Sequence, residues 1–248
     1  MAIKYPSATH RGQKIIEMVY RHRCLSRVQI LKLLSISPTY GSKCLSALCR
    51  DRYLVRKYAQ SFTTPHSFAY YQLDTQGALT IESLLGEVKW QPRDNHPPYT
   101  QHHWEVNNLA IEMVQRWSEE SQFFSEQLMT IPFKHRGQEW ILKPDGALLL
   151  NQGPKQALVF LERERSLQRQ KHFFHKVAMY TAFADGPVAK HFFGRTNFLV
   201  WVICNSQSHC QRLQEWAQSQ GTSGLFGFSP LDIALSDPVK TLIELETC

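Results

Sequence analysis

The chain has 248 residues, of which 28 are Lys or Arg and 21 are Asp or Glu, so its formal net charge is +7. This length fits two modest domains, and the charge is uneven, because residues 1–94 hold 14 of the basic and 6 of the acidic groups. A basic first part attracts a polyanion, and the longest apolar run, 198–204, is too short for a membrane span, so we expect a cytoplasmic protein with no membrane insertion.

The first part predicts three helices and a hairpin. Apolar residues with helical spacing run from Ile15 to Tyr20, and Ser26 with Gln29 forms a capping box that opens a second helix through Leu33. A third helix spans 38–51 and is expected to bury Leu45, Leu48 and Cys44. Strands at 53–58 and 68–73 enclose a Pro-containing turn, and a short helix covers 74–85. This order predicts a winged helix-turn-helix.

In a winged helix the third helix enters the major groove and the wing contacts phosphates. The residues available for DNA contact are, on the third helix, Tyr40, Ser42, Lys43, Ser46 and Arg50, and, on the wing, Arg56 and Lys57. Winged helices also serve as protein-interaction modules, and the basic excess favours DNA. We expect domains at 1–88 and 101–248, joined by a Pro-containing linker at 89–100.

The second part predicts a mixed sheet flanked by helices. A helix at 106–117 is followed by a strand at 123–131 that Pro132 ends. Strands at 140–150 and 156–164 form a hairpin about Gly153, and the elements that follow are expected at 167–183 (helix), 198–204 (strand), 208–219 (helix) and 225–228 (strand). The helix at 167–183 makes a crossover connection. The six cysteines contain no CxxC pair, which predicts reduced thiols.

Three carboxylates converge in this hairpin. Folding about Gly153 places Asp145 nearly opposite Glu162, and Glu164 shares a strand face with Glu162. Carboxylates so close repel one another unless a cation such as Mg²⁺ or Mn²⁺ lies between them or the strand ends are solvated, and spacing alone favours neither. Lys176 is the preferred basic group, since His172, Lys176 and Tyr180 share a helix face, with Lys171 as the competitor.

Other candidates are weaker. Glu105 and Glu126 are more simply exposed or capping groups, and Tyr180 is expected to pack and donate one hydrogen bond and not to attack phosphate. No His-x-His set is present, because His102 and His103 are adjacent and two phenylalanines separate His172 from His175.

The strand order, with Pro-Asp on one strand and Glu-x-Glu on the next, resembles the core of the PD-(D/E)xK nucleases, a restriction-endonuclease-like α+β fold. The whole chain resembles the replication-relaxation family and, within it, the relaxases of the MOB-C class. The motifs that carry this likeness are His103…Asn107-Asn108-Leu109, Lys143-Pro144-Asp145-Gly146, Leu161-Glu162-Arg163-Glu164-Arg165-Ser166 and Lys176…Tyr180.

The resemblance implies a metal-dependent endonuclease that nicks plasmid DNA at an origin of transfer. Asp145, Glu162 and Glu164 would then bind Mg²⁺ or Mn²⁺, and Lys176 would complete the site, because Glu164 stands where these nucleases usually carry a lysine. The partners would be double-stranded and nicked plasmid DNA, with an accessory mobilisation protein or a type IV coupling protein. Two alternatives remain open, a non-catalytic replication or mobilisation regulator and a double-strand endonuclease.

Overall fold

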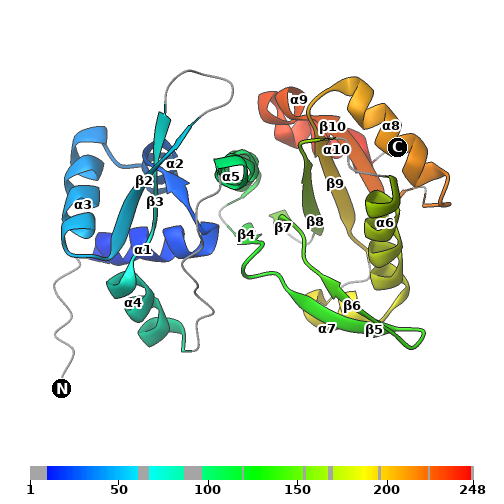
Figure 1. Ribbon diagram of the computed structural model, residues 1–248, viewed down its shortest axis with the longest axis horizontal. Helices are drawn as coiled ribbons and strands as arrows, with labels where there is room; N and C mark the ends of the chain where they lie inside the picture. The colour runs from blue at the N-terminus through cyan, green and yellow to red at the C-terminus, as the bar shows by residue number, and fades with distance from the viewer. Residues whose placement is uncertain are drawn as a thin grey trace. The chain divides into compact units, whose positions relative to one another are not determined.

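The computed structural model in Figure 1 describes residues 10–60, 67–86, 97–118, 120–152, 155–166, 170–194, 197–222 and 224–246. It divides into two compact units, Met1–Asn107 and Asn108–Cys248. The division falls inside helix α5 (Pro97–Trp117) and not in the expected linker at 89–100. Residues 97–100 of that linker are helical, and its remainder lies outside the described residues.

Unit 1 contains the three helices and the hairpin that the sequence predicts. Its elements in chain order are α1 (His10–His22), β1 (Leu25–Ser26), α2 (Arg27–Leu34), α3 (Pro38–Arg50), β2 (Leu54–Gln60), β3 (Ser67–Leu73) and α4 (Thr75–Leu85). Strands β2 and β3 are antiparallel, and β1 pairs with β3 to give the sheet order β1-β3-β2. The sequence did not indicate β1, because two residues are too few to show a strand periodicity.

Local hydrogen bonds fix where the helices of unit 1 begin. The capping box before α2 is confirmed, because the Ser26 N–H donates to Gln29 Oε1 at 2.8 Å and the Gln29 N–H donates to Ser26 Oγ at 3.3 Å. Leu45 and Leu48 are buried as expected, whereas Cys44, also expected in the core, is only half-buried.

The first part of α5 is tied to unit 1 by Asn107. Its amide nitrogen donates to the carbonyl oxygens of His22 at 3.2 Å and Cys24 at 2.7 Å, just after α1 ends. Burial lowers the pKa of His22 to about 4, so this imidazole is neutral near neutral pH. Asn107 in the first motif is therefore a structural residue.

Unit 2 is built on a mixed five-stranded sheet. This sheet contains β4 (Gln122–Ser125), β7 (Gly146–Gln152), β8 (Lys155–Glu164), β9 (Leu199–Cys204) and β10 (Phe226–Pro230), and a separate two-stranded sheet contains β5 (Ile131–His135) and β6 (Gln138–Leu142). The helices of unit 2 after α5 are α6 (Gln170–Asp185), α7 (Val188–Phe193), α8 (Gln207–Gln218), α9 (Leu231–Ser236) and α10 (Pro238–Glu246). The sheet order is β10-β9-β8-β7-β4, with antiparallel pairing from β4 to β8 and parallel pairing from β8 to β10.

Two strand predictions were wrong. Pro132 does not end a strand but lies within β5, where it pairs with Ile141 of β6 in a separate two-stranded sheet. Both strands of such a sheet are edge strands, where proline is tolerated. The expected strand at 140–150 is two strands, β6 and β7, separated by Lys143, Pro144 and Asp145.

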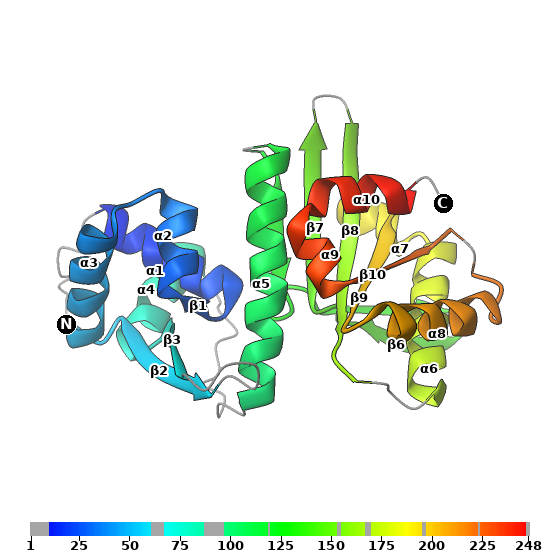
Figure 2. The same cartoon turned by 90° about the horizontal axis from the view of Figure 1, so that it is seen from above.

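The crossover prediction is confirmed, because α6 and α7 connect the parallel strands β8 and β9. Helices α6 and α8 and the β5–β6 hairpin share one apolar core with the sheet (Figure 2). Alternate residues of β8 face this core, which places Phe160 against Tyr180 and Phe183 of α6.

Five cysteines lie in the described ranges, and all five are free thiols, as expected. Within the same ranges, no helix has both the length and the apolar composition that are needed to span a bilayer.

Candidate active site

Asp145 and Glu162 lie opposite each other at one end of the β7–β8 hairpin. Gly146 pairs with Leu161, so the next antiparallel position brings Asp145 opposite Glu162, and the predicted register is confirmed. Asp145 sits just before β7, where its Oδ2 accepts a hydrogen bond of 2.7 Å from the backbone N–H of Arg163. This bond holds the Asp145 carboxylate against the strand that carries Glu162.

Lys176 joins the two glutamates of β8. Its Nζ lies 2.7 Å from Glu162 Oε2 and 2.5 Å from Glu164 Oε1, and both carboxylates are buried. The contact follows from the fold, because the alternate positions 160, 162 and 164 of β8 face α6. The structure therefore brings together the four residues expected at the site, with Lys176 on the helix supplying the ammonium that the strand lacks.

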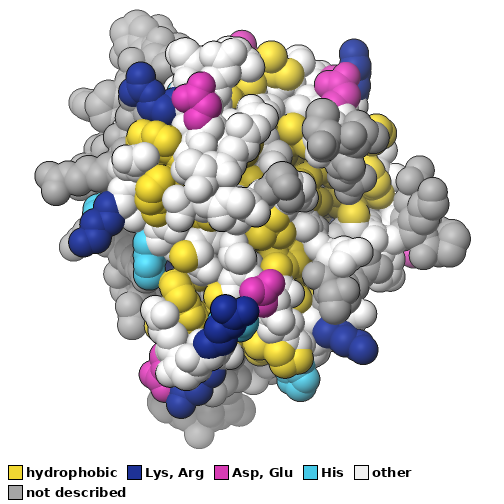
Figure 3. All heavy atoms as spheres, turned by 90° about the vertical axis from the view of Figure 1, so that its right-hand side faces the viewer, with side chains coloured by type: hydrophobic (Ala, Val, Ile, Leu, Met, Phe, Trp, Pro, Cys, Tyr) yellow, Lys and Arg dark blue, Asp and Glu magenta, His cyan; other side chains and the backbone are white. Residues whose placement is uncertain are grey.

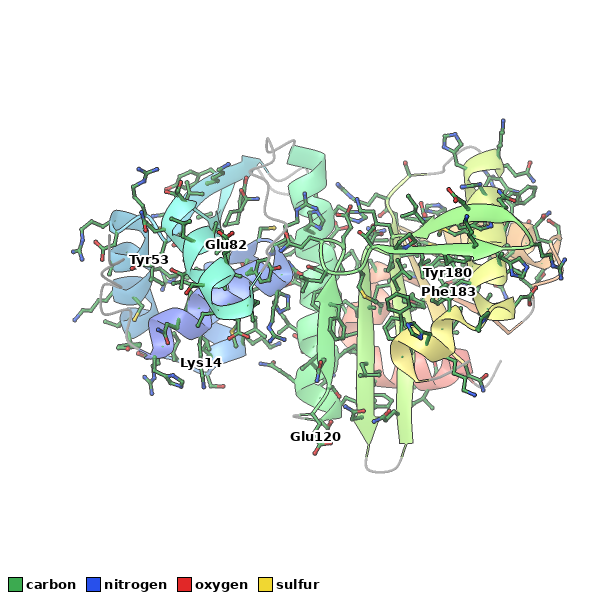
Figure 4. The ribbon with its side chains drawn as sticks, turned by 90° about the horizontal axis from the view of Figure 1, so that it is seen from below. Lys14, Tyr53, Glu82, Glu120, Tyr180 and Phe183 are labelled. Carbon is green, nitrogen blue, oxygen red and sulfur yellow. The ribbon has the colours of Figure 1, made fainter. Side chains whose placement is uncertain are left out.

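Tyr180 completes the group. Its hydroxyl donates a 2.5 Å hydrogen bond to Glu162 Oε1, so Glu162 is held by Tyr180 on one oxygen and by Lys176 on the other. Figure 4 labels Tyr180 and Phe183, which lie on α6 in the core of unit 2. The Tyr180 side chain is fully buried, and the expectation that it packs and donates one hydrogen bond is confirmed.

Burial and charge perturb the ionisation of this group. Burial raises the pKa of Glu162 to about 7; Lys176 opposes this rise, and Asp145 adds to it. Burial alone would lower the pKa of Lys176, but Glu162, Glu164 and Asp145 outweigh it, and the net pKa is raised. Burial, followed by the charge of Glu162, holds the pKa of Tyr180 well above its usual value. Tyr180 therefore stays protonated and is a poor nucleophile.

The raised pKa of Glu162 predicts a pH-dependent stability. A carboxyl whose folded pKa exceeds its unfolded value of 4.5 stabilises the fold fully below that value, and this contribution disappears as pH rises through about 7. Glu162→Gln keeps the neutral form at every pH. Measured by thermal unfolding, the variant should therefore gain stability relative to the wild type between about pH 5 and about pH 8. An unchanged difference across this range would show that Glu162 ionises normally.

Sequence reasoning missed the contacts of Arg163. This buried guanidinium donates from Nη1 to the carbonyl oxygens of Glu164 at 2.8 Å and Ile203 at 3.1 Å, and from Nη2 to Asn205 Oδ1. Asn205 Nδ2 in turn donates to the carbonyl oxygen of Arg165. These bonds join the end of β8 to the end of β9 and keep Glu162 and Glu164 in place. The crossover connection predicts that β8 and β9 are parallel neighbours, and this pairing could have indicated that Arg163 lies near the end of β9.

Fewer carboxylates are placed to bind a divalent ion than the sequence predicts. Among the residues that the structure describes, no three or more His, Cys, Asp and Glu side chains are placed to hold a metal ion. The expected three-carboxylate ligand set is therefore not assembled among them, and Lys176 contacts both Glu162 and Glu164. Asp145 and Glu162 lie opposite each other, and each carboxylate oxygen that accepts a hydrogen bond keeps a second lone pair. Mg²⁺ is commonly bound by one or two carboxylates while keeping several waters. The donor set fits Mg²⁺ or Mn²⁺ in this two-carboxylate form.

The weaker candidates lie outside this group. Lys171 and His172 are exposed on α6, so His172 does not share the buried face of Lys176 and Tyr180. Glu126 Oε1 forms an ion pair of 2.7 Å with Lys143 Nζ. Glu105 belongs to unit 1, where it is buried and accepts a hydrogen bond of 3.0 Å from Gln101.

The expected DNA-contacting residues of unit 1 lie mostly at the surface. Lys43, Ser46 and Arg50 are exposed at helical spacing on α3, and Tyr40 is exposed beside them, with the Arg11 guanidinium 5.3 Å from its ring centroid. Two of these residues already have partners within unit 1. The Ser42 hydroxyl donates to the Pro38 carbonyl oxygen at 2.8 Å, and Arg50 forms an ion pair of 2.9 Å with Asp51. On β2, Arg56 is exposed and Lys57 is half-buried.

The profile of the replication-relaxation family matches residues 16–199, which is more than half of the chain. No curated protein matches. Two solved structures are similar over part of their length. The adhesin competence repressor AdcR of Streptococcus pyogenes has 18% identity and a TM-score of 0.26 and covers 45% of this chain and 69% of its own. Restriction endonuclease FokI bound to DNA has 11% identity and a TM-score of 0.27 and covers 96% of this chain and 46% of its own.

Proposed function

The chain belongs to the replication-relaxation family, and we propose that it is a metal-dependent DNA nickase that acts at the origin of transfer of a mobilisable plasmid. The family suggests a role in replication or mobilisation. The observation that carries the nuclease proposal is the contact of half-buried Lys176 with the buried carboxylates of Glu162 and Glu164, with Asp145 opposite Glu162. In this reading unit 1 is a winged helix that binds the duplex, and unit 2 is a restriction-endonuclease-like domain.

The charge of the site supports binding of a cation and a phosphate together. Three carboxylates and one ammonium leave a net charge of about −2 when all are ionised, which a divalent ion neutralises. Asp145 and Glu162 would hold this ion, which supplies Lewis-acid polarisation of the phosphate and a water of lowered pKa.

The chain's own residues supply orientation and charge. The raised pKa keeps Lys176 protonated, and its ammonium stabilises negative charge that grows on the scissile phosphate. Glu164 holds Lys176 at this position, and Tyr180 fixes the Glu162 carboxylate by its hydrogen bond. The Arg163 N–H orients Asp145. Because Glu162 must be ionised to bind the cation, nicking should become faster as pH rises through about 7.

Incubation of the full chain with supercoiled plasmid that carries its own origin tests this function. With Mn²⁺ the proposal predicts open-circular product, with none in EDTA. Linear product would instead indicate a double-strand endonuclease. If the plasmid stays supercoiled in Mn²⁺ and Mg²⁺ but is bound, the protein is a non-catalytic replication or mobilisation regulator. An unrelated plasmid serves as the control for site specificity.

The winged-helix proposal predicts a salt-dependent loss of DNA binding. Lys43→Ala with Arg50→Ala removes two exposed cations from one face of α3. We expect duplex affinity to fall and the slope of log Kd against log salt to decrease by about 2, because each phosphate contact contributes roughly 0.9. A filter-binding titration across salt concentrations measures this slope. Lys240→Ala, an exposed lysine on α10, is the matched control, and unchanged affinity in the double variant would assign DNA binding to another surface.

A further inference from the structure

A stack of rings runs from the core of unit 2 to its surface beside the candidate active site. Phe183 of α6 contacts Phe133 of β5 edge-on at 5.3 Å, and Phe133 stacks on Trp140 of β6 at 6.4 Å with an interplanar angle of 16°. Trp140 stacks in turn on His175 of α6, with ring centroids 5.3 Å apart and an angle of 28°. Phe183 and Phe133 are buried, Trp140 is half-buried and His175 is exposed.

We propose that His175, backed by Trp140, is a stacking platform for an unpaired DNA base next to the cleaved bond. This inference rests on the proposed function for its biological role, but the binding event is independent of cleavage. An aromatic ring that is held on a rigid stack offers its open face to any nucleobase, because every base has a π-face. One face of the His175 ring lies on Trp140 and the residue is exposed, so we assign the base to the opposite face of the ring.

The position of His175 ties the platform to the reaction. His175 and Lys176 are consecutive residues of α6, so their side chains leave the helix about 100° apart. A strand with its phosphate at Lys176, which contacts Glu162 and Glu164, would reach His175 with a neighbouring nucleotide. A nicked substrate offers unpaired or frayed bases at this point, whereas the bases of an intact duplex are already stacked on one another.

The backing residues fit a role in stacking. The β5–β6 pairing brings Phe133 and Trp140 into register, which fixes the order of the rings. Trp140 Nε1 is buried and has no hydrogen-bond partner among the described residues, so what the indole contributes here is ring area. A buried donor without a partner is unfavourable, and phenylalanine would avoid this cost with a smaller ring.

The part of the chain that carries the platform is not strongly basic. On the face drawn in Figure 3, Lys and Arg side chains are scattered, and some lie beside Asp or Glu side chains. Unit 2, residues 108–248, carries 14 basic and 14 acidic side chains. Charge alone therefore gives unit 2 little affinity for a nucleic acid, and stacking supplies an attraction that does not depend on net charge.

Binding of a short fluorescent oligothymidylate to the full chain in EDTA tests the platform without cleavage. His175→Ala should weaken this binding roughly 10-fold, the usual effect of removing one base-stacking ring. His175→Phe should restore it, because a phenyl ring stacks as well. His191→Ala is the matched control, since His191 is an exposed histidine on α7 that contacts Phe192.

The outcomes separate this inference from the proposed function. If His175→Ala binds the oligothymidylate as the wild type does, or if His175→Phe does not restore binding, the platform is wrong even when the protein nicks plasmid. An equal loss of blunt duplex binding would mean that His175 contacts the backbone, which also overturns the inference. If the wild type fails to nick but shows the expected histidine dependence, the proposed nickase fails and the platform stands.

Discussion

Asp145→Asn should abolish divalent-dependent nicking of supercoiled plasmid while leaving duplex binding intact. Asparagine keeps an Oδ1 that can accept the Arg163 N–H, so the end of the hairpin stays in place. The substitution removes one of two carboxylates that would hold the cation, and we expect a loss on the order of 10³-fold in the nicking rate. The measurement is the rate of open-circle formation in Mn²⁺, with binding followed separately in EDTA.

The matched control for this variant is Asp185→Asn. Asp185 is the last residue of α6, its side chain is 51% exposed, and it lies in the same unit. The same change of charge at this position should leave the nicking rate unchanged. Nicking by Asp145→Asn at the wild-type rate would exclude Asp145 from the mechanism.

Lys176→Met should destabilise unit 2 and also abolish nicking. It leaves Glu162 and Glu164 buried without their shared cation, and breaking a buried ion pair by removing one partner costs about 3–5 kcal/mol. The loss should be smaller at about pH 5 than at about pH 8, because the unpaired carboxylates can then be protonated. Thermal unfolding at both pH values measures this difference.

Lys171→Met separates this effect from a general effect of removing a lysine. Lys171 is exposed on the same helix, so its replacement should change stability by no more than about 0.5 kcal/mol. Lys176→Arg keeps the charge and should recover most of the stability. If Lys176→Met unfolds at the wild-type temperature at both pH values, the ion pairs seen in the structure do not stabilise the protein.

The sequence predicted the hairpin that carries the site because its signals are local. Turn-forming residues at 151–155 set the β7–β8 register, and this register fixes the position of Asp145 opposite Glu162. Lys176 was predicted from helix spacing together with Tyr180, and both contact Glu162. His172 shares a helix face with Lys176 by spacing but is exposed, because spacing does not show how far along a helix that face is covered.

What the sequence could not show depends on contacts between distant segments. The contact between Arg163 and Asn205 joins residues 42 positions apart and follows only from the parallel pairing of β8 and β9. The strand that contains Pro132 was missed because edge position, which makes proline acceptable there, is a property of the folded sheet. The contacts of Lys176 with both Glu162 and Glu164 likewise depend on how α6 packs on β8, which spacing along the sequence does not show.

Binding of Mn²⁺ to the full chain, followed by electron paramagnetic resonance, tests the central claim most directly. The account predicts that the wild type binds Mn²⁺ at a site that Asp145→Asn removes and Asp185→Asn preserves, and that this affinity rises with pH through about 7 as Glu162 ionises. Equal binding by the wild type and Asp145→Asn, or no binding by the wild type at any pH, would contradict a metal-dependent centre at Asp145 and Glu162.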